Sequence, residues 1–161
     1  MRIVIVNGAE CSGKSNYIKA RANSWVDQDR YDWYKFLNEI ETNLMLNLDK
    51  QEFYIECCID NRIRMAQLLD AIAAVNDWAK PFSTVEFNIE LVFIGVNKEI
   101  FKRNLLYRYD CDMSQLDDRV DFSYQKQKII SELMASIEYY KYPLKFVGLD
   151  NPYGAEYVNK D

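Results

Sequence analysis

The chain has 161 residues, with 20 Lys and Arg against 25 Asp and Glu and a formal net charge of −5. This length predicts a single domain over residues 1–161 with a substantial core. The acidic balance disfavours a broad, non-specific grip on nucleic acid. The chain contains no histidine, which excludes a Ser-His-Asp triad and a Cys-His nucleophile pair.

The four cysteines show no Cys-x-x-Cys spacing, so we interpret them as reduced thiols of a cytoplasmic protein and expect no zinc site. The longest early apolar run, Ile3–Val6, is too short for the hydrophobic region of a signal peptide. No apolar stretch approaches membrane-spanning length. We therefore expect no membrane association.

In chain order, the first half alternates strand and helix patterns. Ile3–Val6 has the composition of a buried strand, and Lys14–Trp25 is predicted to be a helix. Val26–Tyr34 is polar and aromatic, typical of a short edge strand or an acceptor-binding loop. Apolar residues then recur at helical spacing over Tyr34–Leu48, and Phe53–Ile59 is a second strong strand.

The second half continues the alternation, with a third, nearly all apolar strand at Ile89–Val96. The other segments are a helix at Ile63–Trp78, a helix at Lys98–Tyr107, a polar irregular piece at Tyr109–Leu116, a long helix at Asp117–Tyr140, a last strand at Leu144–Leu149 and a fraying tail from Asp150. This order predicts an α/β fold of three α/β/α layers around a parallel sheet of about five strands.

The most specific motif follows the first strand directly: residues 8–15, GAECSGKS, match the phosphate-binding loop Gly-x-x-x-x-Gly-Lys-Ser. Gly8 and Gly13 let the backbone turn tightly and bring its N–H groups against a polyphosphate. Lys14 supplies a mobile cation for the β- and γ-phosphates, and the Ser15 hydroxyl suits the bridging magnesium ion.

Ser12 and Asn16 complete the expected nucleotide-binding set, because the helix that begins here points its positive N-terminal end at the anion. The alternative is a glycine-containing turn with an incidental lysine. The β-type residues before the loop and the helical pattern after it favour the phosphate-binding interpretation. We therefore predict a P-loop NTPase fold that uses ATP and Mg²⁺.

Asp60 ends the second strong strand, where ligands of parallel sheets bind. It is a candidate to hold magnesium or to accept a proton from the attacking oxygen; the alternative is a helix N-cap. Arg62 and, with less support, Arg64 are candidates to clamp an acceptor phosphate. The alternative for each is a solvated cation in the first helical turn.

Three further arginines are candidates to stabilise the transferring phosphoryl group: Arg103, Arg108 and Arg119. They lie around a predicted short lid at about residues 108–118. Cations near a helix C-terminus are ordinary, so a purely structural role is the competing interpretation for Arg103 and Arg108. Glu10 is an unusual anion within a phosphate loop, and it either contacts the acceptor or faces solvent.

Gly95-Val96-Asn97-Lys98 has part of the guanine-reading motif of GTPases. Position 100 is Ile where that motif has Asp, and no Asp-x-x-Gly element occurs. The sequence therefore disfavours a GTPase.

The chain resembles the nucleoside monophosphate kinase group, and within it the thymidylate kinase-like branch. The acidic third position of the P-loop, Glu10, is shared with that branch, as are the strand and arginine-bearing helix at residues 88–103. In this resemblance Arg108 begins the lid, and the Leu-Asp-Asp-Arg segment ending at Arg119 resembles the region after the lid, with Tyr124 in the following helix. The resemblance implies that Glu10 works near the acceptor sugar.

The resemblance implies an ATP- and Mg²⁺-dependent kinase whose acceptor is a small-molecule nucleotide, with a deoxynucleoside monophosphate as the leading expectation. The compact length would suit a bacteriophage protein. Asp60-Asn61 also resembles polynucleotide 5′-kinases, so a nucleoside or a 5′-hydroxyl acceptor stays open. A nucleotide-binding regulator without catalysis is a third hypothesis. Apolar residues on helix surfaces would suit a homodimer.

Overall fold

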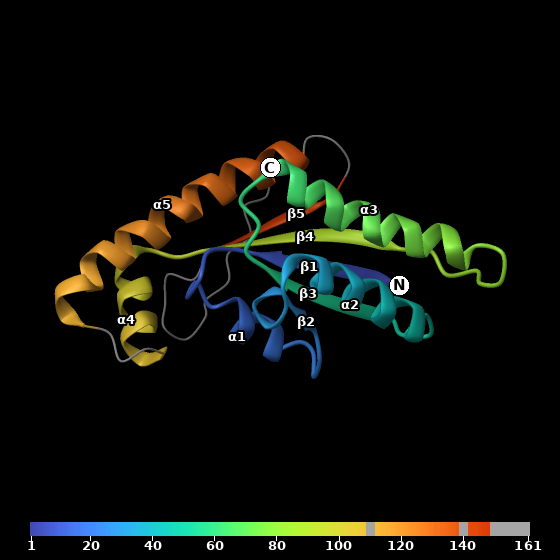
Figure 1. Ribbon diagram of the computed structural model, residues 1–161, viewed down its shortest axis with the longest axis horizontal. Helices are drawn as coiled ribbons and strands as arrows, with labels where there is room; N and C mark the ends of the chain where they lie inside the picture. Colours follow the sequence, from blue (N-terminus) through green and yellow to red (C-terminus); the bar gives the residue numbers. More distant parts are fainter. Residues whose placement is uncertain (109–111, 139–141, 149–161) are drawn as a thin grey trace.

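The computed structural model describes residues 1–108, 112–138 and 142–148. Its centre is a parallel five-stranded sheet with the order β2-β3-β1-β4-β5 (Figure 1). The strands are β1 (Arg2–Asn7), β2 (Val26–Asp27), β3 (Glu52–Cys57), β4 (Asn88–Gly95) and β5 (Leu144–Gly148). The predicted α/β fold and parallel five-stranded sheet are confirmed, with the short β2 at one edge.

The central strand β1 is buried from Ile3 to Asn7. It pairs with β3 on one side and β4 on the other, so that Ile5 lies opposite both Ile55 and Leu91. A strand paired on both sides and covered on both faces requires the continuous apolar run seen in the sequence. The P-loop leaves the carboxyl end of this strand and therefore lies at the middle of the sheet edge.

Helices lie on both faces of the sheet, and more of them cover one face than the other. They are α1 (Lys14–Lys19), α2 (Trp33–Leu46), α3 (Arg62–Ala79), α4 (Lys98–Arg108) and α5 (Met113–Glu138), with a short 3₁₀ turn at Gln28–Arg30. The larger core joins Ile3 and Ile5 to residues of α2, α3, α4 and α5. On the other face, Val4 and Val6 pack against Tyr17 and Ile18 around α1, which lies apart from α3 and α5 in Figure 1.

Two predicted helix boundaries are wrong. The helix after the P-loop ends at Lys19 instead of Trp25, and the following chain brings the Trp25 indole to Glu56. The long helix starts at Met113 instead of Asp117, because the Asp112 carboxylate accepts a hydrogen bond from the Ser114 N–H and starts the helix earlier.

The predicted lid is consequently more helical than expected. Arg108 is the last residue of α4, and residues 113–118 form the first turns of α5. Positions 109–111, the predicted end of the long helix at Tyr140, the predicted strand end at Leu149 and the tail from Asp150 lie outside the described residues.

Two side-chain amides join the carboxyl ends of the strands to neighbouring segments. The Asn7 amide donates to the Ile59 carbonyl at 3.0 Å, and its oxygen accepts from the Ile59 N–H at 2.8 Å. Gln127 forms the equivalent pair with Val96. Both amides are buried, so they fix the backbone around the P-loop.

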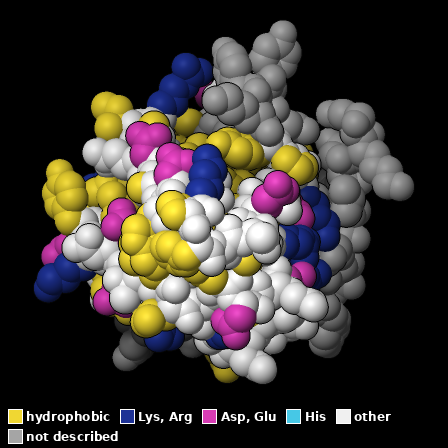
Figure 2. Space-filling model, turned by 90° about the vertical axis from the view of Figure 1, so that its right-hand side faces the viewer, with side chains coloured by type: hydrophobic (Ala, Val, Ile, Leu, Met, Phe, Trp, Pro, Cys, Tyr) yellow, Lys and Arg dark blue, Asp and Glu magenta, His cyan; other side chains and the backbone are white. Residues whose placement is uncertain are grey.

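At the opposite end of the molecule, where the strands begin, Figure 2 shows hydrophobic side chains gathered among charged ones. Exposed large hydrophobic residues near the ends of α2 and α3 include Leu46, Trp78 and Phe82. The homodimer suggested by the sequence remains a prediction. Within the described residues, the helices lack the combination of length and apolar character that spanning a membrane requires.

Candidate functional site

The P-loop is held in a tight conformation against β4. Cys11 and Gly13 have left-handed backbones, with φ of 61° and 96°. A Cβ on Gly8 would lie 2.9 Å from the Ser12 hydroxyl and 3.0 Å from the Ile94 carbonyl oxygen. A glycine is therefore required at position 8 for close packing, while left-handed residues turn successive backbone N–H groups toward a common anion site.

Ser12 provides an independent indication that the loop fits a polyphosphate. Its hydroxyl is fully buried. Among the described residues, it is the one buried side-chain polar atom without a hydrogen-bond partner. A buried hydroxyl without a partner costs about 1–3 kcal/mol. A phosphate oxygen bound in the loop is a chemically suitable acceptor for it.

A pocket of about 250 Å³ opens over this loop. Its lining includes the phosphate-loop residues Lys14, Ser15 and Asn16 together with Cys11, Gly13, Lys19, Asp29, Glu56, Asn104, Tyr107 and Arg108. Lys14 is buried, and its ammonium donates to the Ala9 carbonyl at 2.8 Å. The structure thus gathers Gly13, Lys14, Ser15 and Asn16 around one cavity, as their predicted role requires.

Glu56, on β3, is a site residue that the sequence analysis missed. One carboxylate oxygen accepts from the Ser15 hydroxyl and the other from the Trp25 indole N–H, both at 2.7 Å. Burial raises the pKa of Glu56, and the hydrogen bond from Ser15 offsets part of that effect. The available signal was a single charged residue inside the apolar strand Phe53–Ile59.

Asp60 lies away from this pocket, in a separate hollow of about 260 Å³ beside α5. Its carboxylate is 4.0 Å from the Lys126 ammonium, and Arg62 lines the same hollow. The helix cap is supplied by Asn61, whose side chain accepts from the Arg64 N–H at 2.9 Å, so the alternative cap role of Asp60 is wrong. Its proposed roles in metal binding and catalysis, and that of Arg62 in acceptor binding, stay predictions.

The three candidate lid arginines occupy different places. Arg108 lines the P-loop pocket beside Cys11; burial raises the pKa of that thiol, and a hydrogen bond with Arg108 opposes the rise. Arg119 lines an adjacent pocket together with Glu10. Arg103 is exposed on α4 and is not among the lining residues of either pocket. The structure therefore brings Arg108 and Arg119 to the loop and leaves Arg103 outside.

Asn104 is a second residue that the sequence analysis missed. Its side-chain amide donates to the Cys11 carbonyl at 2.8 Å and so joins α4 to the P-loop. Nothing in the local sequence distinguishes this asparagine from a solvent-facing one, because the contact joins residues 93 positions apart.

The side-chain oxygens of the P-loop pocket suit a cation that phosphate oxygens also bind. Within the described residues, no group of three or more His, Cys, Asp or Glu side chains is placed to hold a metal ion. Mg²⁺ characteristically uses one or two protein oxygens together with phosphate oxygens and water. Ser15 and Glu56, already in contact, offer such a pair.

No protein-family model matches the chain, and no curated protein matches it. Among solved structures, it is similar to a gluconokinase from Sinorhizobium meliloti 1021, with 13% identity and a TM-score of 0.55 over 92% of this chain and 83% of that one. A sugar kinase from Janibacter sp. HTCC2649 has 13% identity and a TM-score of 0.49 over 94% and 87%.

A deoxyadenosine kinase from M. mycoides, solved with products dCMP and a flexible dCDP, has 13% identity and a TM-score of 0.42 over 91% and 89%. At these identities the likeness concerns the fold. The chain has a P-loop NTPase-like α/β fold with distant structural similarity to P-loop kinases.

Proposed function

We propose that this protein transfers the γ-phosphoryl group of ATP, with Mg²⁺, to a nucleotide, and that a deoxynucleoside monophosphate is the leading acceptor. The observation that carries this proposal is the arrangement of Lys14, Ser15 and Glu56 around one pocket over a glycine-bearing loop. This arrangement combines a cation, a hydroxyl and a carboxylate at the place where the β- and γ-phosphates would lie.

Each of these groups has a defined task. Lys14 would leave the Ala9 carbonyl, 2.8 Å away, to contact the phosphates. Ser15 and Glu56 would hold Mg²⁺, which supplies positive charge to the phosphate oxygens. Arg108, which lines the same pocket, would stabilise the charge that develops on the transferring group.

In the reaction, an acceptor oxygen forms a new bond to the γ-phosphorus as the bond to ADP breaks, so that ADP leaves with the bridging oxygen. When the acceptor is a nucleoside monophosphate, the attacking atom is one of its phosphate oxygens and the product is a diphosphate. The P-loop amides and Lys14 hold the donor in line with that oxygen.

A polynucleotide acceptor has less support. A groove that follows a nucleic-acid backbone combines cations along its length with stacking aromatic residues. The chain has a net charge of −5. Carboxylates line each of three pockets formed by the described residues, represented by Glu10, Glu56 and Asp60. A compact acceptor fits this charge distribution better than a strand.

The test is ADP formation from ATP and Mg²⁺ with nucleoside monophosphates, nucleosides, gluconate and a 5′-hydroxyl oligonucleotide, each supplied separately. Turnover with a monophosphate that falls about a thousandfold or more in Lys14→Ala is the expected result. Lys35→Ala is the matched control, since Lys35 is an exposed lysine on α2 that is not among the lining residues of the P-loop pocket.

Acceptor-dependent turnover with a nucleoside, gluconate or the oligonucleotide alone would replace the monophosphate assignment. ATP binding without acceptor-dependent ADP formation would contradict the kinase proposal and support the nucleotide-binding regulator. Calorimetric titration of ATP into the wild type and Lys14→Ala separates loss of binding from loss of chemistry.

A further inference from the structure

A second pocket, of about 430 Å³, adjoins the phosphate loop on the side away from Glu56. The described residues that line it are one P-loop residue, one α4 residue and a group on α5: Glu10, Leu105, Gln115, Asp118, Arg119, Phe122 and Ser123. A volume of this size is in the range of sites that enclose small ligands. We call it the α5 pocket.

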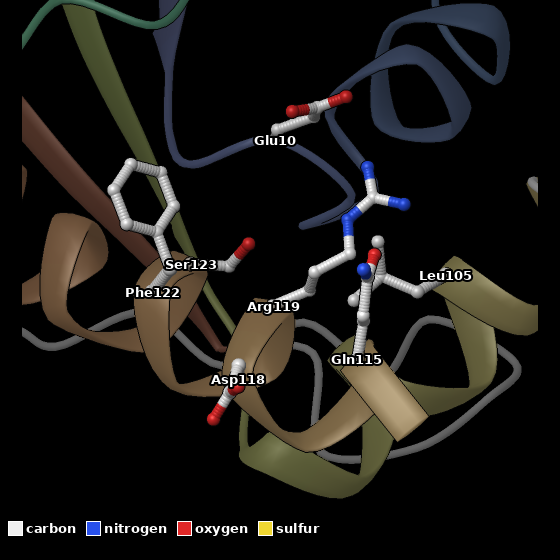
Figure 3. A pocket seen from close by; sticks show the side chains of 7 residues that line it. All are labelled: Glu10, Leu105, Gln115, Asp118, Arg119, Phe122 and Ser123. Carbon is white, nitrogen blue, oxygen red and sulfur yellow. The ribbon is translucent and has the colours of Figure 1, made fainter. Parts of the chain in front are cut away.

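The α5 pocket has chemically distinct ends (Figure 3). Arg119 extends from α5 toward the P-loop, with Gln115 and Leu105 to one side of it and Phe122 and Ser123 to the other. Glu10 lies across the pocket, on the loop.

The Arg119 end of this pocket lies beside the P-loop pocket. On α4, Leu105 lines the α5 pocket and its neighbour Asn104 lines the P-loop pocket. In the P-loop, Glu10 lines the α5 pocket and its neighbour Cys11 lines the P-loop pocket. An acceptor whose reacting group is held near Arg119 would therefore have that group next to the γ-phosphate position. The opposite end, at Phe122, would hold the part of the acceptor that does not react.

The side chains at the two ends of the pocket suit different chemical groups of a ligand. A guanidinium and an amide, from Arg119 and Gln115, suit phosphate oxygens. The carboxylate of Glu10 accepts hydrogen bonds from hydroxyl groups. Phe122 lines the pocket although its side chain is 70% exposed, which leaves an aromatic face available for a planar ring.

We infer that the α5 pocket is the acceptor site, with the acceptor phosphate at Arg119 and Gln115, a sugar hydroxyl at Glu10 and the base stacked on Phe122. This inference rests on the proposed function and adds to it the place and orientation of the substrate. It assigns binding roles to Gln115 and Phe122.

The pocket composition also distinguishes a monophosphate from larger anions. Among the described residues that line it, Arg119 is the single cation, beside the carboxylates Glu10 and Asp118. The same face of α5 continues to a second hollow lined by Ile129 and Glu132, and Lys126, between the two, approaches Asp60 at 4.0 Å. An acceptor with one phosphate matches this distribution better than a di- or triphosphate.

The experiment measures acceptor and ATP KM values for Phe122→Ala and Arg119→Gln with the preferred monophosphate. Phe122→Ala should raise the acceptor KM about tenfold, the effect expected for loss of one stacked base, and leave the ATP KM unchanged. Arg119→Gln should raise the acceptor KM at least as much. Sugar 5-phosphates without a base should bind the wild type and Phe122→Ala equally.

Matched controls come from the same helix. Ile129→Ala removes an exposed apolar side chain of α5 that lines the other hollow, and Lys128→Gln removes an exposed cation; both should leave the acceptor KM unchanged. A rise in KM for Ile129→Ala without a rise for Phe122→Ala would overturn the inference and move the acceptor to the hollow at Asp60 and Arg62. Thermal unfolding verifies that each variant is folded.

Direct binding separates this inference from the proposed function. Calorimetry with deoxynucleoside monophosphates alone should show binding that weakens about tenfold in Phe122→Ala, whether or not ADP forms. Turnover with a monophosphate combined with unchanged binding in Phe122→Ala and Arg119→Gln would overturn the site and keep the function. Absence of binding by any monophosphate would overturn the site.

Discussion

The side-chain amide of Gln127 pairs with both backbone polar groups of Val96, accepting from its N–H at 2.9 Å and donating to its carbonyl at 2.8 Å. Gln127 is on α5, and Val96 is the residue after β4. The pair thus ties the long helix that lines the α5 pocket to the sheet edge that carries the P-loop. Both residues are buried, so water has little access to replace either bond.

Gln127→Leu should therefore destabilise the protein by about 2–4 kcal/mol, because the Val96 N–H and carbonyl are left buried without partners. Equilibrium urea unfolding measures the change. Gln125→Leu, at an exposed position of the same helix, should change stability by less than about 0.5 kcal/mol. Equal losses in the two variants would show that the Val96 contact contributes nothing specific.

Gly8→Ala should abolish ATP binding or weaken it by at least about tenfold, since its Cβ would meet the Ile94 carbonyl oxygen at 3.0 Å and the Ser12 hydroxyl at 2.9 Å. The backbone oxygen cannot move without displacing β4. Gly95→Ala is the comparison, because its closest contact, at 3.1 Å, is the Phe93 ring, which a side-chain adjustment can relieve. ATP titration calorimetry compares them, and undiminished affinity in Gly8→Ala would refute the close-packing argument.

Trp25→Phe should raise the Mg²⁺ concentration for half-maximal turnover about tenfold, because the indole N–H holds one oxygen of Glu56 at 2.7 Å. Hydrogen bonds to charged groups contribute about 1.5–3 kcal/mol. Loss of this bond should also raise the pKa of Glu56 further, moving the acidic limb of the pH–rate profile upward.

Trp33→Phe is the matched control for Trp25→Phe. The Trp33 indole donates to the Gln67 side chain, also at 2.7 Å and also partly buried. Neither Trp33 nor Gln67 is among the lining residues of the P-loop pocket, so the Mg²⁺ dependence should stay unchanged. An equal shift in both variants would point to a general loss of stability.

Glu56→Gln should lower turnover about a hundredfold or more, because a bound metal ion contributes several kcal/mol to catalysis. The same variant should be more stable than the wild type at neutral and higher pH. Burial raises the pKa of Glu56 above its ordinary value of 4.5. The contribution of such a group to stability is complete below the unfolded-state pKa and is lost as pH rises through the folded-state pKa. The stability advantage of the variant should therefore shrink toward pH 4.

Thermal unfolding from pH 4 to pH 8 measures that dependence. The wild type should lose stability relative to Glu56→Gln as pH increases through the raised pKa. A difference independent of pH would show that Glu56 is not titrating with a raised pKa. Full activity in Glu56→Gln would exclude the metal-binding role and return attention to Asp60.

The strands and the phosphate loop were predictable because their signals are local. A run of apolar residues at Ile3–Val6 requires burial on both faces, and Gly8, Gly13, Lys14 and Ser15 have fixed spacing in a continuous segment. The helix start at Met113 was missed because the polar composition of residues 109–116 predicted an irregular segment. The helix begins earlier, where the Asp112 carboxylate accepts a hydrogen bond from the Ser114 N–H.

By itself, the sequence determined the α/β class, the alternation that gives a parallel sheet and the identity of the loop after the first strand. Only the tertiary structure decided that Glu56, rather than Asp60, contacts Ser15, and that Arg119 shares a pocket with Glu10 while Arg103 lies outside both pockets. The reason is physical: a periodic pattern fixes which face of an element is buried, but contacts between residues 41 positions apart, as for Ser15 and Glu56, depend on how the elements pack.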